Sequence, residues 1–244
     1  MLTIKEITYA FENTEAILNQ VSMEISQGEF VSVIGASGSG KSTLFKLITG
    51  LLEPDQGKIE IGTQTSENRL GMVGYMPQKD LLLPWRTVVE NIVIPFEASK
   101  KNKHVKLPEI REWLVRFGLE KYEKSYPHEL SGGMRQRVAF LRTLMTGKEL
   151  LLLDEPFGAL DSLTKRNMHN WLLGLWGELQ KTVLFITHDL EEAILLSDRI
   201  YLLHAEGKSL QEIKVTLPRP RTSELVYQSD FITIRKELEQ LIHG

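Results

Sequence analysis

Residues 35–42 read GASGSGKS and directly follow the apolar run of residues 30–34. The spacing G-x-x-x-x-G-K-[ST] in this position predicts a strand that ends at Gly35 and a helix that begins near Lys41. Glycines allow successive backbone N–H groups to converge on one anion, and the positive end of the helix adds to their field. The segment therefore restricts the chain to folds that place a phosphate-binding loop between a buried strand and a helix.

Four short apolar runs lack the alternation that marks a half-exposed strand. They lie at residues 30–34, 150–153, 183–186 and 200–203. Runs of this kind suit strands buried on both faces, as in a parallel sheet covered by helices. Between the runs, apolar residues recur at helical spacing at residues 44–48, 134–145 and 168–179. Strands that alternate with helices predict an α/β fold with a parallel sheet.

The N-terminal stretch carries a different pattern. Val21, Met23 and Ile25 alternate with polar residues, as do Ile59 and Ile61. Alternation of this kind predicts half-exposed antiparallel strands, which would form a β-subdomain near the N-terminus.

The middle of the chain is helical in character. Residues 81–148 show helical patterns and no convincing strand, and the apolar spacing over residues 231–241 predicts a terminal helix. We therefore expect a single domain over residues 1–244, in which a helical subdomain is inserted into an α/β core. The core would occupy about residues 1–80 and 150–244, and the helical subdomain about residues 81–149.

Two acidic residues end the second apolar run, in the sequence LLLLDE at residues 150–155. Asp154 is expected to hold Mg²⁺, mostly through water, and the Ser42 hydroxyl to provide a second ligand. Lys41 can reach the β- and γ-phosphates of ATP, and Glu155 is expected to orient and deprotonate the attacking water. Loop and acidic strand together predict an enzyme that hydrolyses ATP with Mg²⁺.

The composition excludes several other classes of protein. The chain has no cysteine, which removes disulfides, thiolate chemistry and cysteine-ligated zinc, and which fits a reducing compartment. Its formal net charge of -3 gives no general attraction to nucleic acid or to an anionic membrane. No apolar run approaches the roughly 18 residues of a membrane span, and the N-terminus lacks a secretory signal. We expect a cytoplasmic protein with no nucleic-acid partner, which meets membranes only through a partner protein.

Three further motifs make the prediction more specific. They are YMPQ at residues 75–78, LSGGMRQR at residues 130–137 and THD at residues 187–189. Together with the phosphate loop and the acidic strand, they resemble the ATP-binding subunits of ABC transporters and follow the order found in that family. The resemblance covers essentially the whole chain. It implies a P-loop NTPase core with an N-terminal antiparallel β-subdomain and an inserted α-helical subdomain.

The resemblance also implies roles for individual residues. Gln78 would contact Mg²⁺ and the attacking water, and His188 would contact the γ-phosphate. Asp161, in the sequence GALD, would belong to the D-loop. Phe11 would stack on adenine, although it is alternatively an ordinary strand residue. The implied ATP-binding residues are Phe11, Gly35, Ala36, Ser37, Gly38, Ser39, Gly40, Lys41, Ser42 and Thr43. The implied Mg²⁺ ligands are Ser42, Gln78 and Asp154, and the implied catalytic residues are Gln78, Glu155 and His188.

The LSGG motif also has a physical interpretation of its own. Ser131 is a good N-cap, Gly132 and Gly133 let a backbone come close, and an amphipathic helix follows. The chain thus has two helix N-termini suited to phosphate. In the family the second one comes from another chain, so the resemblance implies an ATP-dependent homodimer that closes head to tail over two ATP molecules. Met134 stands where glutamine is commoner in the family, and we expect this departure to change little.

The sequence after Gln78 narrows the kind of transporter. KDLLLPWRTVVENI at residues 79–92 is similar to the ATPases of the nitrate, sulfonate and taurine import group, which also serves thiamine-pyrimidine precursors. Trp85 could then lie in the groove that receives the permease, and the alternative explanation of LPW is a packed turn. The group implies transmembrane permease subunits and an extracytoplasmic solute-binding protein as partners. The chain would then be peripheral on the inner face of the cell membrane.

Two other functions are compatible with part of the motif set. A soluble ABC ATPase of DNA repair would carry a long coiled-coil insertion, whereas only short segments lie between Lys41 and Ser131. A translation-type member would usually have two cassettes in one chain, and here there is one. A nucleotide-binding regulator without turnover would not need both Glu155 and His188. Powering import is therefore the leading hypothesis.

Overall fold

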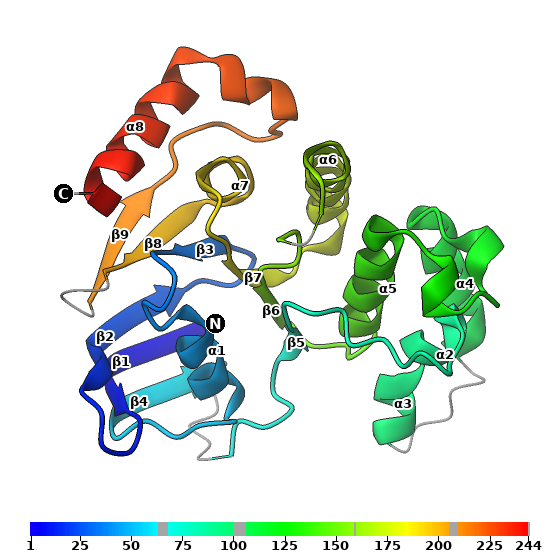
Figure 1. The fold of residues 1–244 in the computed structure, drawn as a ribbon, viewed down its shortest axis with the longest axis horizontal. Helices are drawn as coiled ribbons and strands as arrows, with labels where there is room; N and C mark the ends of the chain where they lie inside the picture. The colour runs from blue at the N-terminus through cyan, green and yellow to red at the C-terminus, as the bar shows by residue number, and fades with distance from the viewer. Residues whose placement is uncertain (63–67, 100–105, 159, 205–208, 244) are drawn as a thin grey trace.

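The computed structural model describes residues 1–62, 68–99, 106–158, 160–204 and 209–243. Within these residues the larger sheet is built from β3 (Phe30–Ile34), β5 (Gly74–Met76), β6 (Leu150–Asp154), β7 (Thr182–Ile186), β8 (Arg199–Leu203) and β9 (Leu210–Lys214). Its strand order is β5-β6-β7-β3-β8-β9 (Figure 1). Neighbouring strands are parallel except β9, which pairs antiparallel with β8. The predicted α/β fold with a parallel sheet is confirmed.

Alternate residues of the central strands face two different cores. Leu150 and Leu152 of β6 pack with α1 (Lys41–Thr49) and the N-terminal strands. Leu151 and Leu153 pack on the opposite face, against the helices that follow β5 and β6. All four side chains are fully buried, which explains why the strand reads as a continuous apolar run.

The two edge strands of the larger sheet, β5 and β9, are not among the predicted strands. β5 contains only three residues, Gly-Tyr-Met, too few to show a period. β9 has the sequence LQEIK, and each of its residues is half-buried or exposed. Edge strands tolerate polar residues because one side of the strand and much of its face meet solvent. Apolar runs identify the buried centre of this sheet and not its edges.

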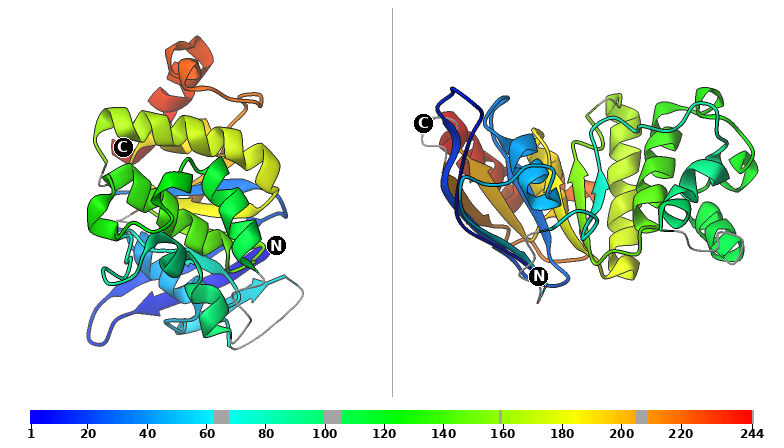
Figure 2. Two further views of the ribbon diagram at one scale, coloured as in Figure 1. Left: turned by 90° about the vertical axis from the view of Figure 1, so that its right-hand side faces the viewer. Right: turned by 90° about the horizontal axis from the view of Figure 1, so that it is seen from below.

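The smaller sheet has the order β2-β1-β4 and is antiparallel throughout. Its strands are β1 (Leu2–Ala10), β2 (Ala16–Ile25) and β4 (Gln56–Ile61). Ile4 lies opposite Met23 on one side and Ile59 on the other, so the apolar members of the alternating pattern share one face. That face packs on α1, which lies between the two sheets (Figure 2). The predicted antiparallel strands are thereby confirmed.

The helices between β5 and β6 gather at one side of the molecule (Figures 1 and 2). They are α2 (Val88–Ile92), α3 (Ile94–Ala98), α4 (Leu107–Arg116) and α5 (Gly132–Leu144), with single 3-10 turns at Glu120–Tyr122 and Pro127–Glu129. As predicted, the described parts of residues 81–148 contain no strand.

The remaining helices follow the later strands. α6 (Ser162–Leu179) and α7 (Leu190–Leu196) come after β6 and β7, and the predicted terminal helix is α8 (Ser229–His243), preceded by the 3-10 helix η4 (Ser223–Tyr227). Phe231, Ile234 and Leu238 of α8 pack with α7 in a third apolar cluster. Among the helices of the described residues, none is sufficiently long and apolar to cross a membrane.

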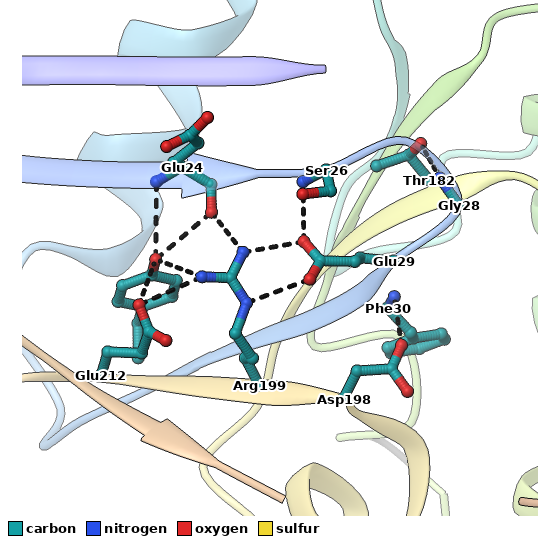
Figure 3. A network of polar contacts seen from close by, with 10 residues as sticks. Glu24, Ser26, Gly28, Glu29, Phe30, Thr182, Asp198, Arg199 and Glu212 are labelled. Carbon is teal, nitrogen blue, oxygen red and sulfur yellow. Dashed lines mark hydrogen bonds and ion pairs between the residues drawn. The ribbon is translucent and has the colours of Figure 1, made fainter.

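A cluster of half-buried and exposed polar groups joins the two sheets (Figure 3). Arg199 of β8 pairs with Glu29 (Nη2–Oε2, 2.7 Å) and Glu212 (Nη1–Oε2, 3.1 Å), and Nη2 also donates to the Glu24 carbonyl of β2. Burial alone would lower the pKa of Arg199, but the hydrogen bond to Glu29 and the neighbouring charges outweigh it and raise the pKa. We call this group the Arg199 network.

Candidate active site

The phosphate loop joins the end of β3 to the start of α1. Lys41 is only 7% exposed, and its Nζ donates to the carbonyl oxygens of Gly35 and Ala36, each at 2.8 Å. Gly40 has φ +103°, and a Cβ there would lie 2.8 Å from Cγ2 of Ile17, so this position requires glycine. The lysine amine is therefore held over a loop that carries no large side chain.

The N-terminus of α1, a helix described in full, is left open toward the loop. Its N-cap, Gly40, offers no side chain, and the first turn holds no acidic residue. Backbone N–H groups of a first turn have no partner within the helix and favour an anion. Burial lowers the pKa of Lys41, while the charges of Glu155 and Asp154 act in the opposite direction. A phosphate group would restore both the lost solvation and the missing hydrogen bonds.

Asp154 is a buried carboxylate at the carboxyl end of β6. It is 6% exposed, and the Tyr75 hydroxyl donates to its Oδ2 at 3.3 Å. Burial raises the pKa of Asp154, and burial together with the Asp154 charge raises the pKa of Tyr75 to about 12. A divalent cation would stabilise such a desolvated carboxylate, and Ser42 lines the adjacent cleft with a second hard oxygen. The residues present thus fit the predicted Mg²⁺ site.

Three predicted catalytic residues meet at one oxygen of Glu155. Gln78 Nε2 donates to Glu155 Oε2 at 3.1 Å, and His188 Nδ1 lies 3.3 Å from the same oxygen. Glu155 itself has φ +44°, a backbone conformation that residues other than glycine rarely adopt. Such backbone strain is found where function over-determines a residue's position. Here it directs the carboxylate toward the groups on the neighbouring strands.

The reason for this convergence is the strand order. Gln78, Glu155 and His188 follow β5, β6 and β7, and the phosphate loop follows β3. These four strands are consecutive neighbours in the larger sheet and run parallel, so their carboxyl ends open on the same edge. Ligands of open α/β sheets bind at this edge. Segments far apart in the sequence are brought together by the topology alone.

A cleft of about 410 Å³ lies between these groups. Its lining is Ile17, Ser37, Gly38, Gly40, Lys41, Ser42, Thr43, Gln78, Glu155 and His188. Apart from Ile17 of β2, every lining residue belongs to the predicted set. Ile17 lies in an N-terminal strand whose pattern gives no sign of a ligand. Tyr75, the partner of Asp154, lies in YMPQ but had no predicted role.

The remaining predicted residues lie outside this lining. Phe11 follows the end of β1, is 42% exposed, and packs edge to face on Tyr9 with ring centroids 5.2 Å apart. Asp161 is the N-cap of α6 and accepts a hydrogen bond from Thr164 N at 3.0 Å. Of the GALD segment, Ala159 falls outside the described residues.

The LSGG residues form a second, separate helix N-terminus. Ser131 is the N-cap of α5, and its hydroxyl accepts from Met134 N at 3.3 Å. A Cβ on Gly133 would lie 2.8 Å from Thr164 Cγ2, so this glycine permits close packing of α5 on α6. The Met134 side chain packs against the apolar cluster beside the larger sheet. That methionine at position 134 changes little stays a prediction.

Comparison with known proteins decides the family. The profile described as ABC transporter matches residues 18–158, a span that contains the phosphate loop, Gln78, the LSGG motif and Glu155. The chain belongs to the ABC transporter family. As an ABC protein, it is an ATPase that uses ATP and Mg²⁺.

Several relatives of the chain are named as import ATP-binding proteins. It is 48% identical over 83% of its length to the formylaminopyrimidine import ATP-binding protein ThiZ of Halalkalibacterium halodurans, covering 79% of that protein. It is 41% identical over its full length to the aliphatic sulfonates import ATP-binding protein SsuB of Bacillus cereus, covering 96%. A dimeric ATP-binding cassette in a post-hydrolysis state, bound to ADP and Pi, matches 89% of the chain and 100% of its own with TM-score 0.76 and 31% identity. The predicted resemblance and fold class are confirmed.

Proposed function

We propose that the chain is the ATP-hydrolysing subunit of an ABC importer and acts through transmembrane permease subunits. The observation that carries the proposal is the meeting of Gln78, Glu155 and His188 beside Lys41, in a chain whose relatives carry import names. A member of the family without turnover would not need a carboxylate held in a strained backbone at this point.

The chemistry follows from the positions of the side chains. Lys41 and the loop N–H groups bind the β- and γ-phosphates, and Thr43, Ser37 and Gly38 complete the lining around them. Ser42, Asp154 and Gln78 would hold Mg²⁺, which when bound neutralises charge on the β- and γ-phosphate oxygens.

Hydrolysis requires a base and a correctly placed water. Glu155 takes a proton from the water while the water oxygen bonds to the γ-phosphorus. The bond between that phosphorus and the β–γ bridging oxygen breaks. Gln78 and His188 both contact Glu155 Oε2, at 3.1 and 3.3 Å. We assign His188 to the γ-phosphate as well. The products are ADP and inorganic phosphate, and no covalent intermediate forms on the protein.

We further propose that the site is completed by a second copy of the chain. Ser131, Gly132 and Gly133 do not line the described cleft of their own chain, although they form an N-terminus suited to phosphate. Two copies arranged head to tail would place this N-terminus on the γ-phosphate held by the other copy's Lys41, with Asp161 near the same junction. Phe11 would contact the adenine.

The permease is proposed to dock beside Trp85. The side chain is 71% exposed, and Leu81, a few residues earlier, is also exposed. Both follow Gln78 and precede α2, where exposed apolar side chains can anchor a partner. The packed-turn alternative for Trp85 is disfavoured by this exposure. We assign α2–α5 to a helical subdomain at about residues 81–149, which would lie against the permease at the inner face of the membrane.

The solute is proposed to belong to the nitrate, sulfonate, taurine or thiamine-pyrimidine-precursor class and to be delivered by an extracytoplasmic solute-binding protein. The test is affinity purification of the chain from its native cells in mild detergent, followed by mass spectrometry. We expect a multi-span membrane protein and a solute receptor whose bound ligand identifies the cargo. Recovery of DNA-repair proteins or ribosomes in their place would contradict the proposal.

A further inference from the structure

A second set of charged groups lies between α6 and α7, beside the segment that leads into His188; Glu192 and His169 are buried, and Lys165 and Asp189 are half-buried. Glu192 of α7 is 2% exposed, and its Oε1 lies 2.9 Å from Lys165 Nζ and 3.0 Å from His169 Nε2. The Thr187 hydroxyl donates to the other oxygen, Oε2. Lys165 and His169 come from α6, so one buried carboxylate joins two helices and the segment that leads into His188.

The same groups contact the two residues that precede and follow His188 in the sequence, Thr187 and Asp189. Asp189 N donates to the Thr187 hydroxyl at 3.0 Å, and Lys165 Nζ donates to Asp189 Oδ2 at 3.0 Å. Burial acts against both charges, but Glu192 and then Asp189 outweigh it and raise the pKa of Lys165, while Lys165 lowers the pKa of Asp189. Both residues that flank His188 are therefore held by contacts to Glu192 or Lys165.

The network also reaches the start of α6. Lys165 lies in the first turn after the N-cap Asp161, and Thr164 of that turn packs on Gly133 of the LSGG motif. The His169 ring packs edge to face on Phe157, two residues beyond Glu155, with centroids 5.3 Å apart. Contacts from the segment that follows β6, from α5 and from the segment around His188 thus meet on residues 164–169 of α6.

A buried ion pair is a poor way to gain stability alone, because desolvation of the charges offsets most of their attraction. Its directional contacts do hold the joined segments in one arrangement. Resting on the proposed role of His188, we infer that Glu192 is a positioning residue that sets the location of His188 beside Glu155, and that Lys165 links this position to the helix beginning at Asp161.

The central experiment is a double-mutant cycle between Glu192→Gln and His188→Ala in the purified chain. Glu192→Gln preserves the size of the side chain and removes its charge. We expect it to lower kcat by about 10-fold or more and to change ATP affinity, measured by equilibrium fluorescence, by less than about 2-fold. In the His188→Ala background, the same substitution should change kcat by less than about 2-fold, because the residue acts through His188.

The matched control is Glu29→Gln, the same substitution in the Arg199 network (Figure 3). Glu29 directly precedes β3, whereas the phosphate loop follows the other end of that strand. Glu29→Gln should lower the melting temperature to a degree similar to Glu192→Gln, but it should leave kcat unchanged. If Glu192→Gln does not fold, Thr187→Val removes only the hydroxyl between Glu192 and Asp189, and the same pattern of kcat and affinity is expected.

Several outcomes would overturn the inference. Glu192→Gln with unchanged kcat and a lowered melting temperature would show a structural role alone. Equal losses of kcat with and without His188 would show that Glu192 acts by another route. A normal kcat for His188→Ala would instead remove the proposed catalytic role of His188, a failure of the proposed function that is distinguishable from the other two.

Discussion

Replacing Glu155 by glutamine tests whether the Glu155 carboxylate accepts the proton of the attacking water. In the structure, Glu155 Oε2 accepts from Gln78 Nε2 and faces His188 Nδ1, and the phosphate loop contributes to the same cleft. Glutamine occupies nearly the same volume, and its amide oxygen can still accept from Gln78. Lys41 and the loop are untouched. The substitution thus removes a proton acceptor while the ATP-binding groups remain.

The expected magnitude follows from the loss of a general base. A positioned base contributes about 10²- to 10⁴-fold to a rate, which corresponds to about 2.7–5.5 kcal/mol of transition-state stabilisation. The substitution does not alter the contacts of Lys41 with the loop. The binding free energy of ATP should therefore change by less than about 1 kcal/mol, and the dissociation constant by less than roughly 5-fold. ATP therefore remains bound without being cleaved, and the two-copy complex it joins should accumulate.

Two measurements check this prediction. Steady-state phosphate release gives the rate, and light scattering with Mg-ATP should show a species of about twice the 27.9 kDa chain mass. Glu149→Gln is the matched control, because Glu149 precedes the same strand at its opposite end and pairs with Lys181. A Glu155→Gln chain that cleaves ATP at the wild-type rate, or that stays monomeric with ATP, would refute the reasoning.

Three further predictions concern single side chains. Lys41→Ala should abolish tight ATP binding in a fluorescence titration, because the amine held over the loop would contact the phosphates, whereas Lys46→Ala on the exposed side of α1 should bind normally. Unchanged affinity in the Lys41 variant would count against the loop assignment. Trp85→Ala should leave ATP affinity intact but reduce co-purification with the permease, whereas Leu70→Ala, at another exposed apolar residue (57%, against 71% for Trp85), should not; retention of the complex by both variants would favour the packed turn. Asp154→Asn should raise the melting temperature without Mg²⁺ by about 2–4 °C while abolishing Mg²⁺-dependent hydrolysis. The sign follows from the raised pKa of Asp154: the ionised group opposes folding at neutral pH, and the wild type should become more stable as the pH falls toward that pKa. A lower melting temperature for the variant would contradict this argument.

The features predicted correctly from the sequence share a physical cause. The buried strands around Leu151 and Leu184 are apolar on both faces because each packs against two cores. The phosphate loop is recognisable because Gly40 cannot carry a Cβ beside Ile17. In both cases a structural requirement at a few neighbouring residues restricts which amino acids can stand there, and the sequence shows that restriction directly.

The features that escaped prediction depend on tertiary contacts. β9 is an edge strand with a mixed composition, and nothing in LQEIK distinguishes it from a loop. Lys165, His169 and Glu192 lie on two helices, and their charges have the pattern of a solvated helix face. Only the packing of α6 on α7 shows that Lys165 and His169 meet at the buried carboxylate of Glu192. Sequence motifs identify the groups that face the ligand more readily than those that hold them in place.

The most direct test of the account is a crystal or cryo-EM structure of the Glu155→Gln chain with ATP and Mg²⁺. We predict a symmetric pair in which each γ-phosphate contacts Lys41 of one copy and the Ser131 hydroxyl of the other. A nucleotide-bound pair in which the LSGG helix of neither copy reaches a phosphate of its partner would contradict the central claim.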